Sequence, residues 1–211
     1  MSKFLIADDH PLYREALQGA LQSRFDKIGF VESDTLTTTL ASLRKHRNIS
    51  LILLDLTMPG CDNFYGLLRI GESFPNIPIV VVSASDSINV IAQVMEFGAR
   101  AFIPKTLATA ELVKGILAVL DGKKWLPEGV EEQLISVDKG TVEVGHQVRE
   151  LTPKQFKVLK LVKRGMTNKE IADTLNVTEA TVKAHIGTLF KRLQVKSRTQ
   201  ILVAVEKLQL E

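Results

Sequence analysis

The first 120 residues alternate short apolar runs with stretches in which apolar residues recur at helical spacing. The apolar runs are residues 4–7, 51–54 and 79–82, with weaker ones at 29–31 and 101–103. Runs this short, bounded by polar residues or proline, are typical of strands buried on both faces of a sheet. Between the runs, sets such as Leu12, Ala16 and Ala20 follow the period of a helix.

Five repeats of strand then helix predict a parallel sheet with right-handed crossovers and helices on both faces. The fold class expected is therefore α/β, a flavodoxin-like (βα)5 domain with a five-stranded parallel sheet. Its last helix is expected at residues 107–120. After Gly122 the periodicity fades, and residues 122–147 are interpreted as a linker, in which Val142 and Val144 give a weak signal for a short strand.

The C-terminal segment contains strong signals for helix starts and ends. A Ser or Thr followed three residues later by Glu or Gln forms a capping box. Such pairs are Thr152–Gln155, Thr167–Glu170 and Ser197–Gln200, and Thr178 is a further N-cap candidate. Gly165 and Asn176 stand where a helix end needs a left-handed residue. Four helices are expected, at residues 153–164, 168–175, 179–193 and 198–208.

Only residues 176–178 separate the two middle helices of this segment. Two short helices with a tight connection form a helix-turn-helix, and the flanking helices would complete its core. The chain is thus expected to contain an α/β domain at residues 1–121, a linker at 122–147, and an all-α domain of four helices at 148–211.

The charge of the chain is divided unevenly between these parts. The net charge is +3 overall, whereas residues 151–211 carry twelve Lys or Arg against five Asp or Glu, a net +7. Residues 1–121 and 122–150 each carry a net −2. A basic C-terminal domain favours a polyanionic partner such as nucleic acid, although charge by itself fits a solvated lysine-rich surface equally well.

Composition excludes several classes of protein. No apolar run approaches the roughly 20 residues needed to span a bilayer, so no membrane partner is expected. The apolar stretch near the start is too short for a signal peptide, which predicts a cytoplasmic protein. With Cys61 as its only cysteine, the chain can form neither an intramolecular disulfide nor a cysteine cluster for zinc.

Acidic residues stand at the ends of two predicted strands. Asp8 and Asp9 follow the first strand and Asp55 ends the third, so the three carboxylates should meet at one sheet edge. Such a cluster is costly unless a hard cation such as Mg2+ binds there. Ser83 follows strand four and Lys105 follows strand five, so every strand end except the second supplies chemistry.

This set of residues resembles the receiver domain of bacterial response regulators, over residues 1–121, with Phe102 as a further match. The resemblance implies that Asp55 accepts a phosphoryl group and that Lys105 pairs with the phosphoryl oxygens. It also implies that Asp9, Asp8, Asp55 and the backbone carbonyl of Thr57 hold Mg2+, and that Ser83 and Phe102 form the switch. Asn63 and Thr106 depart from the glycine and proline usual at these positions.

The helix expected at residues 179–193 has two distinct faces. Its core face is a narrow stripe formed by Val182, Ile186, Leu189 and Leu193. The opposite face carries small residues and lysines, including Ala184, Gly187 and Lys191. Small residues permit close approach, so this face has the shape and charge that suit a DNA major groove.

Residues 148–211 resemble the LuxR-type helix-turn-helix, and the whole chain resembles the NarL/FixJ-type response regulators. The resemblance is carried by Leu151-Thr152-Pro153, Asn168-Lys169-Glu170-Ile171-Ala172 and Thr181-Val182-Lys183-Ala184-His185. It implies that Lys183, Ala184 and Gly187 approach base edges, while Thr181 and His185 lie by phosphates. Gly187 departs from the larger polar residue common there, which favours a contribution from DNA shape.

The family commonly dimerises through its last helix, where Ile201, Val205 and Leu208 form an apolar stripe. Internal packing is the competing explanation of this stripe, but paired DNA half-sites favour a homodimer. The partners expected are double-stranded DNA, a sensor histidine kinase, a second copy of the chain and RNA polymerase.

Together these features predict a transcription regulator in which phosphorylation of Asp55 controls dimerisation and DNA binding. It is expected to catalyse only its own phosphorylation and dephosphorylation. A constitutive DNA-binding protein whose receiver only dimerises is an alternative. A metal-dependent phosphatase is disfavoured because the sequence offers no second catalytic acid.

Overall fold

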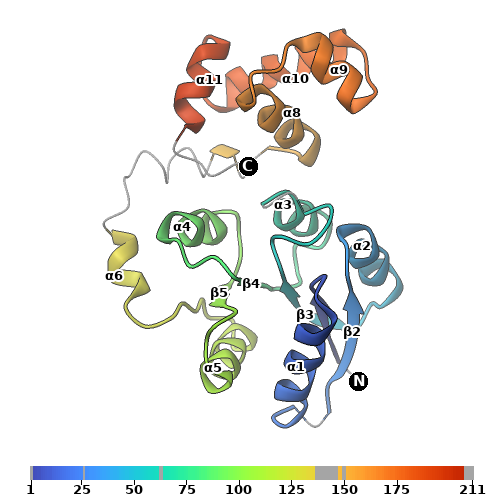
Figure 1. Cartoon of the computed structure of the whole chain (residues 1–211), viewed down its shortest axis with the longest axis vertical. Coiled ribbons are helices and arrows are strands. Elements are labelled where there is room, and N and C mark those ends of the chain that lie inside the picture. Colours follow the sequence, from blue (N-terminus) through green and yellow to red (C-terminus); the bar gives the residue numbers. More distant parts are fainter. Residues whose placement is uncertain (1, 26, 62–63, 136–146, 149–150, 207–211) are drawn as a thin grey trace. The chain divides into compact units, whose positions relative to one another are not determined.

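The structure is a computed structural model that describes residues 2–25, 27–61, 64–135, 147–148 and 151–206. The chain divides into two compact units, Met1–Ser136 and Val137–Glu211 (Figure 1). The predicted weak strand at Val142 and Val144 lies outside the described residues, as does Asn63.

The first unit is built on a parallel five-stranded sheet. Its strands are β1 (Lys3–Ala7), β2 (Gly29–Ser33), β3 (Ile49–Leu54), β4 (Ile79–Ser83) and β5 (Ala101–Pro104). Their order is β2-β1-β3-β4-β5, and each neighbouring pair is parallel. The predicted α/β sheet is confirmed, and each strand contains the apolar run that predicted it.

Helices cover both faces of this sheet. They are α1 (Pro11–Gln22), α2 (Leu36–Lys45), α3 (Phe64–Ser73), α4 (Ile88–Glu96) and α5 (Thr109–Leu120). Figure 1 shows α1 and α5 on one side and α2, α3 and α4 on the other. Alternate strand residues such as Phe4, Ile6 and Leu53 pack with α1 and α5 in one buried cluster. The intervening residues, including Phe102, face the other way and are also fully buried.

The first unit continues past residue 121, where the linker was expected to begin. Trp125 pairs with the outer edge of β5, since its N–H donates to the Arg100 carbonyl at 3.0 Å and its carbonyl accepts from Phe102 N–H at 3.4 Å. Its ring packs against the core of the unit, and helix α6 (Val130–Ile135) packs on α4. This part of the expected linker is therefore ordered against the α/β domain.

The Trp125 ring packs against α5 at Gly115, where the absence of a side chain leaves room for it. A Cβ at position 115 would lie 2.8 Å from a carbon of the indole ring, so we expect Gly115→Ala to push the ring outward. Overpacking of about 1–3 kcal/mol should outweigh the roughly 1 kcal/mol that alanine contributes to a helix. Because Trp125 is the only tryptophan, its fluorescence should shift to the red. Gly19→Ala on α1 is the matched control, with nothing within 4 Å of its Cβ. Unchanged emission from the Gly115 variant would contradict this packing.

The second unit is helical, as predicted. It contains α8 (Pro153–Lys163), α9 (Asn168–Leu175), α10 (Glu179–Arg192) and α11 (Arg198–Val205). Capping boxes open α8 at Thr152 and α9 at Thr167, and Thr178 caps α10. The third predicted capping box is only half formed, because Gln200 Oε1 accepts from Lys196 N–H instead of the Ser197 N–H.

The connection between α9 and α10 is a tight turn. Asn176 adopts the left-handed conformation with φ +53° and ends α9, as its position predicted. Helix α10 packs on α8, α9 and α11, which places a helix-turn-helix inside a small helical core. Ile201 and Val205 are fully buried, so this part of the apolar stripe on the last helix packs internally. Leu208 lies outside the described residues.

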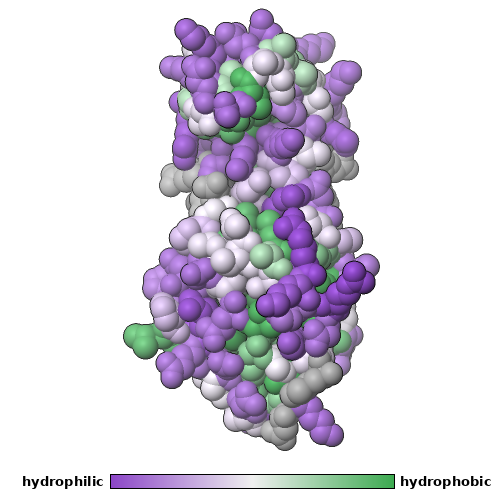
Figure 2. Space-filling view, turned by 90° about the vertical axis from the view of Figure 1, so that its right-hand side faces the viewer, coloured by the Kyte–Doolittle hydropathy of each residue, from purple (hydrophilic) through white to green (hydrophobic). Residues whose placement is uncertain are grey.

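The described helices include none that is long and apolar enough to cross a membrane. Hydrophilic residues cover most of the face drawn in Figure 2, and apolar groups interrupt them in small areas. The large apolar side chains that remain exposed include Leu12 on α1, Leu117 and Leu120 on α5, and Val203 on α11.

Candidate functional site

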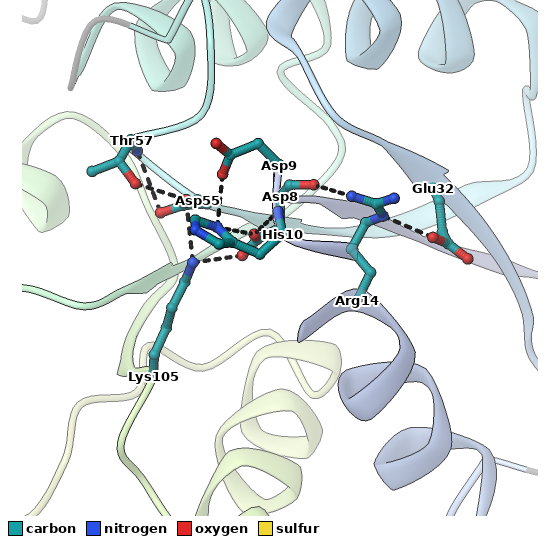
Figure 3. A network of polar contacts seen from close by, with 8 residues as sticks. All are labelled: Asp8, Asp9, His10, Arg14, Glu32, Asp55, Thr57 and Lys105. Atoms are coloured by element: carbon teal, nitrogen blue, oxygen red, sulfur yellow. Dashed lines mark hydrogen bonds and ion pairs between the residues drawn. The ribbon is translucent and has the colours of Figure 1, made fainter. Parts of the chain in front are cut away.

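Three carboxylates meet at the carboxyl edge of the sheet, as the order of the strands requires (Figure 3). Strands β1 and β3 are neighbours, and the Asp55 N–H donates to the Ala7 carbonyl at 2.8 Å. Asp8 and Asp55 are 2% and 1% exposed, whereas Asp9 is partly exposed. Two buried acids side by side repel each other, so the site needs compensating positive charge.

Lys105, which directly follows β5, supplies part of this charge. Its Nζ lies 2.7 Å from Asp8 Oδ2 and 3.2 Å from Asp55 Oδ2. Burial disfavours the charged form of Lys105, but its contact with Asp8 and the charges of Asp55 and Asp8 outweigh this, and the pKa of Lys105 is raised. The lysine is therefore held as an ammonium between the two acids. The Lys105–Thr106 peptide is trans.

Thr57 orients the Asp55 carboxylate from the loop after β3. Its Oγ1 donates to Asp55 Oδ2 at 2.8 Å, and its N–H donates to Asp55 Oδ1 at 3.3 Å. With Lys105, these contacts direct donors at both carboxylate oxygens. The Thr57 carbonyl as a metal ligand stays a prediction.

His10 is a member of the cluster that the sequence reasoning missed. Its ring Nδ1 lies 2.9 Å from Asp9 Oδ1 and 3.2 Å from Asp8 Oδ1. Its backbone N–H donates to Asp8 Oδ1 at 2.8 Å. One ligand atom from each of Asp8, Asp9, His10 and Asp55 lies within 4.8 Å of the others, a spacing that one metal ion can bridge. The donors are mostly carboxylate oxygens, which fit a hard divalent cation such as Mg2+.

Tyr13 packs against Lys105 at the site, a contact that the sequence did not predict. The Lys105 ammonium lies 4.8 Å from the centre of its ring, a cation–π contact. Burial, with the negative charges of Asp8 and Asp55, raises the pKa of Tyr13 to about 12. Tyr13 therefore keeps its phenol proton and adds no further negative charge beside the acids.

The two predicted switch residues lie on β4 and β5. Ser83 ends β4 and is buried, and its Oγ accepts from the Ser85 N–H at 3.2 Å. Among the hydrogen bonds of the described residues, none joins Ser83 to Asp55. Phe102 is fully buried within the sheet layer. The structure thus presents Phe102 in an inward position, with the serine hydroxyl held in its own loop.

Strand β2 also contributes to the site, although its end was expected to supply no chemistry. Glu32 in β2 binds the Arg14 side chain, with 2.7 Å between Oε2 and Nε. Arg14 in turn donates from NH1 to the backbone carbonyl of Asp8 at 2.7 Å (Figure 3). This contact connects the strand end to the loop that carries the acids.

The predicted DNA-binding residues all lie on α10. Val182, Ile186 and Leu189 are buried, as the sequence pattern required. Thr181, Lys183, Ala184 and Lys191 are exposed, and His185 and Gly187 are half-buried. At 100° per residue, Ala184, Gly187 and Lys191 lie on the side of the helix opposite the buried stripe, and Lys183 flanks that side. Thr181 Oγ1 lies 2.9 Å from Thr178 Oγ1 at the helix start.

Two family models match the chain. The response regulator receiver domain matches residues 4–117, and the luxR family of bacterial regulatory proteins matches residues 149–205. The two matches cover the α/β unit with its acidic site and the helical unit with its helix-turn-helix.

Several known proteins are similar along nearly the whole chain. The glycerol metabolism activator of Pseudomonas putida is 34% identical over an alignment of 213 positions, which covers 97% of this chain and 95% of that protein. The nitrate/nitrite response regulator NarL of Escherichia coli strain K12 is 30% identical over 206 residues, which cover 96% of this chain and 94% of that protein. RcsB is 25% identical and covers 99% of both chains, with a TM-score of 0.61 in its DNA complex and 0.59 in a structure of two dimers on two parallel DNAs.

Proposed function

Because this chain belongs to the response regulators that join a receiver domain to a LuxR-family DNA-binding domain, we propose that phosphorylation of Asp55 controls DNA binding by α10. The observation that carries this proposal is the buried Asp8–Asp55–Lys105 cluster, on the same chain as a basic helix-turn-helix. The regulated process is transcription, which is also named for LnrK of Bacillus subtilis (strain 168), a transcriptional regulatory protein that is 27% identical to this chain.

Asp55 is the proposed phosphoryl acceptor. One of its carboxylate oxygens attacks the phosphorus of the donor, and a new O–P bond forms while the bond to the leaving group breaks. The leaving group departs with the bonding electrons. Thr57 holds the carboxylate in one orientation, which restricts the attack to one direction.

Lys105 and the acids around it prepare the site for the charge of the phosphoryl group. The Lys105 ammonium contacts Asp55 Oδ2. After transfer, it can bind an oxygen of the phosphoryl group attached to Asp55. Asp8, Asp9, His10 and Asp55 would hold Mg2+, with the Thr57 carbonyl as a further ligand. When bound, Mg2+ supplies positive charge that stabilises the equatorial oxygens of the transferred group.

Ser83 and Phe102 are the proposed switch. Ser83 exchanges its local bond with the Ser85 N–H for one to the phosphoryl oxygen, and Phe102 is stabilised in its inward position. Two states of the β4–β5 face result, and phosphorylation favours one of them.

The DNA contact is assigned to the exposed side of α10. Lys183, Ala184 and Gly187 approach base edges, Thr181 and His185 lie by phosphates, and Lys191 adds charge. The small side chains support close approach, and the net +7 charge of residues 151–211 supports attraction to the phosphate backbone.

The proposed partners follow from this scheme. A sensor histidine kinase supplies the phosphoryl group, and the protein works in the cytoplasm, with the DNA. The solved RcsB dimers on DNA support a homodimer, and RNA polymerase is a further partner of a regulator of this type. The catalytic activity proposed is limited to self-phosphorylation and its reversal.

The test compares DNA affinity and oligomeric state with and without acetyl phosphate in the presence of Mg2+. We expect at least tenfold tighter binding of the target DNA, a coupling of about 1.4 kcal/mol, together with a shift toward dimers in sedimentation. Chelation of Mg2+ should remove both effects. Equal affinity in all conditions would contradict the proposal and favour a constitutive DNA-binding protein.

A further inference from the structure

We propose that Arg14 is a positioning residue for the divalent cation, and that Glu32 holds its side chain in place. Arg14 fixes the backbone carbonyl of Asp8, and through it the turn that carries Asp8, Asp9 and His10. The inference rests on the proposed function, since it concerns the same cation site. Neither residue belongs to the set that resembles the receiver site in sequence.

The contact lies at the point where β1 ends. The Asp8 N–H donates to the Ser33 carbonyl at 3.0 Å and so belongs to the sheet, as the last bond between β1 and β2. The Asp8 carbonyl is taken by Arg14 instead, at 2.7 Å from NH1. A side chain from the first turns of α1 therefore closes the loop that begins at Asp8.

The carbonyl of Asp8 belongs to the peptide group that joins Asp8 to Asp9. Because a peptide group is planar, fixing its oxygen also fixes the nitrogen and Cα direction of Asp9. Asp9 is the more exposed of the acids, and its own contact is with His10, which is itself largely exposed. Arg14 thus restrains the backbone of the acid that is least restrained by burial.

The burial of the two partners separates their roles. The Arg14 side chain is 14% exposed, whereas that of Glu32 is 44% exposed. An ion pair that reaches solvent stabilises a fold by only about 0–1 kcal/mol, so the pair has little value for stability. Its geometric effect is larger, because Glu32 binds Nε and leaves NH1 directed at the carbonyl.

Arginine is required for this arrangement. Its planar guanidinium presents Nε and NH1 in a fixed fork, which donates to Glu32 and to the Asp8 carbonyl at the same time. A lysine carries the same charge on a single nitrogen and cannot reproduce both contacts in one plane. Arg14→Lys therefore separates the position of the donors from the charge.

The test is Mg2+ binding, measured by titration calorimetry on the full chain without phosphodonor or DNA. We expect Arg14→Gln and Arg14→Lys each to weaken Mg2+ binding about tenfold, as loss of a group that orients metal ligands does. Charge by itself predicts the opposite result, since removal of a cation near the site in Arg14→Gln should strengthen Mg2+ binding, and Arg14→Lys should leave it unchanged.

Arg69→Gln is the matched control, because Arg69 forms an exposed pair with Glu72 on α3 at 3.1 Å. It should bind Mg2+ like the unaltered protein. Thermal unfolding without Mg2+ checks that the variants fold. If Arg14→Gln does not fold, the Mg2+ affinity of Arg14→Lys decides the test. Unchanged or tighter Mg2+ binding in the Arg14 variants would overturn the inference. Absence of Mg2+ binding in the unaltered protein would overturn the cation site of the proposed function instead.

Discussion

Asp55→Asn is expected to abolish phosphoryl labelling of the protein by acetyl phosphate and Mg2+. The amide lacks the nucleophilic carboxylate oxygen, and the proposed role of the neighbouring acids Asp8 and Asp9 is to hold the cation. Loss should be complete within detection, and the increase in DNA affinity should disappear with it. Radiolabelled or mass-shifted protein measures the first effect, and fluorescence anisotropy of labelled DNA measures the second.

The substitution should leave the fold intact, since Asn is isosteric and its Oδ1 still accepts from Thr57. Asp121→Asn is a suitable control, because this exposed acid caps the C-terminal end of α5, away from the carboxyl edge of the sheet. It should be labelled like the unaltered protein. Persistence of label in the Asp55 variant would remove Asp55 from the role of acceptor.

Lys183→Glu is expected to reduce the affinity for target DNA by roughly a hundredfold or more, since like charges brought together at an interface cost several kcal/mol. Lys183 is exposed and flanks the side of α10 that lies opposite the buried stripe. Lys183→Ala should weaken binding less and make the slope of log affinity against log salt shallower, because it removes one positive charge that attracts the DNA phosphates. Anisotropy titrations at several salt concentrations measure the affinities and the salt slope.

The control for this series is Lys114, an exposed lysine on α5 that pairs with Glu111 at 3.4 Å. Lys114→Glu changes the net charge of the chain as much as Lys183→Glu does. If both variants lost DNA affinity equally, overall charge would explain the effect, and α10 would lose its assignment as the DNA-contacting helix.

Much of the fold follows from the sequence because the apolar runs are unambiguous. Runs such as residues 51–54 have no helical alternative of sufficient length, and parallel order then brings Asp8 and Asp55 to one edge. Helix caps such as Thr152 and Thr167 have a local mechanism, so their position needed no knowledge of the tertiary structure. These features depend on near neighbours in sequence or on the sheet alone.

The features that were missed depend on the reach of single side chains. Glu32 lies in a weakly predicted strand, and its meeting with Arg14 depends on the register between β1 and β2, in which it lies opposite Ile6. Trp125 forms one bridge with no periodicity to mark it. The position of His10 directly after two acids was a signal that could have been read, since a histidine there lies within two residues of both predicted metal ligands.

Trp125 also covers part of an exposed edge of the sheet. In the strand order β2-β1-β3-β4-β5, the last strand would otherwise present unpaired backbone groups on its outer side, a surface that can recruit strands from other molecules. The bridge at Ala101 covers part of that side. A fragment cut at residue 121 would lose this cover, so a receiver intended to stay monomeric at high concentration should extend through α6.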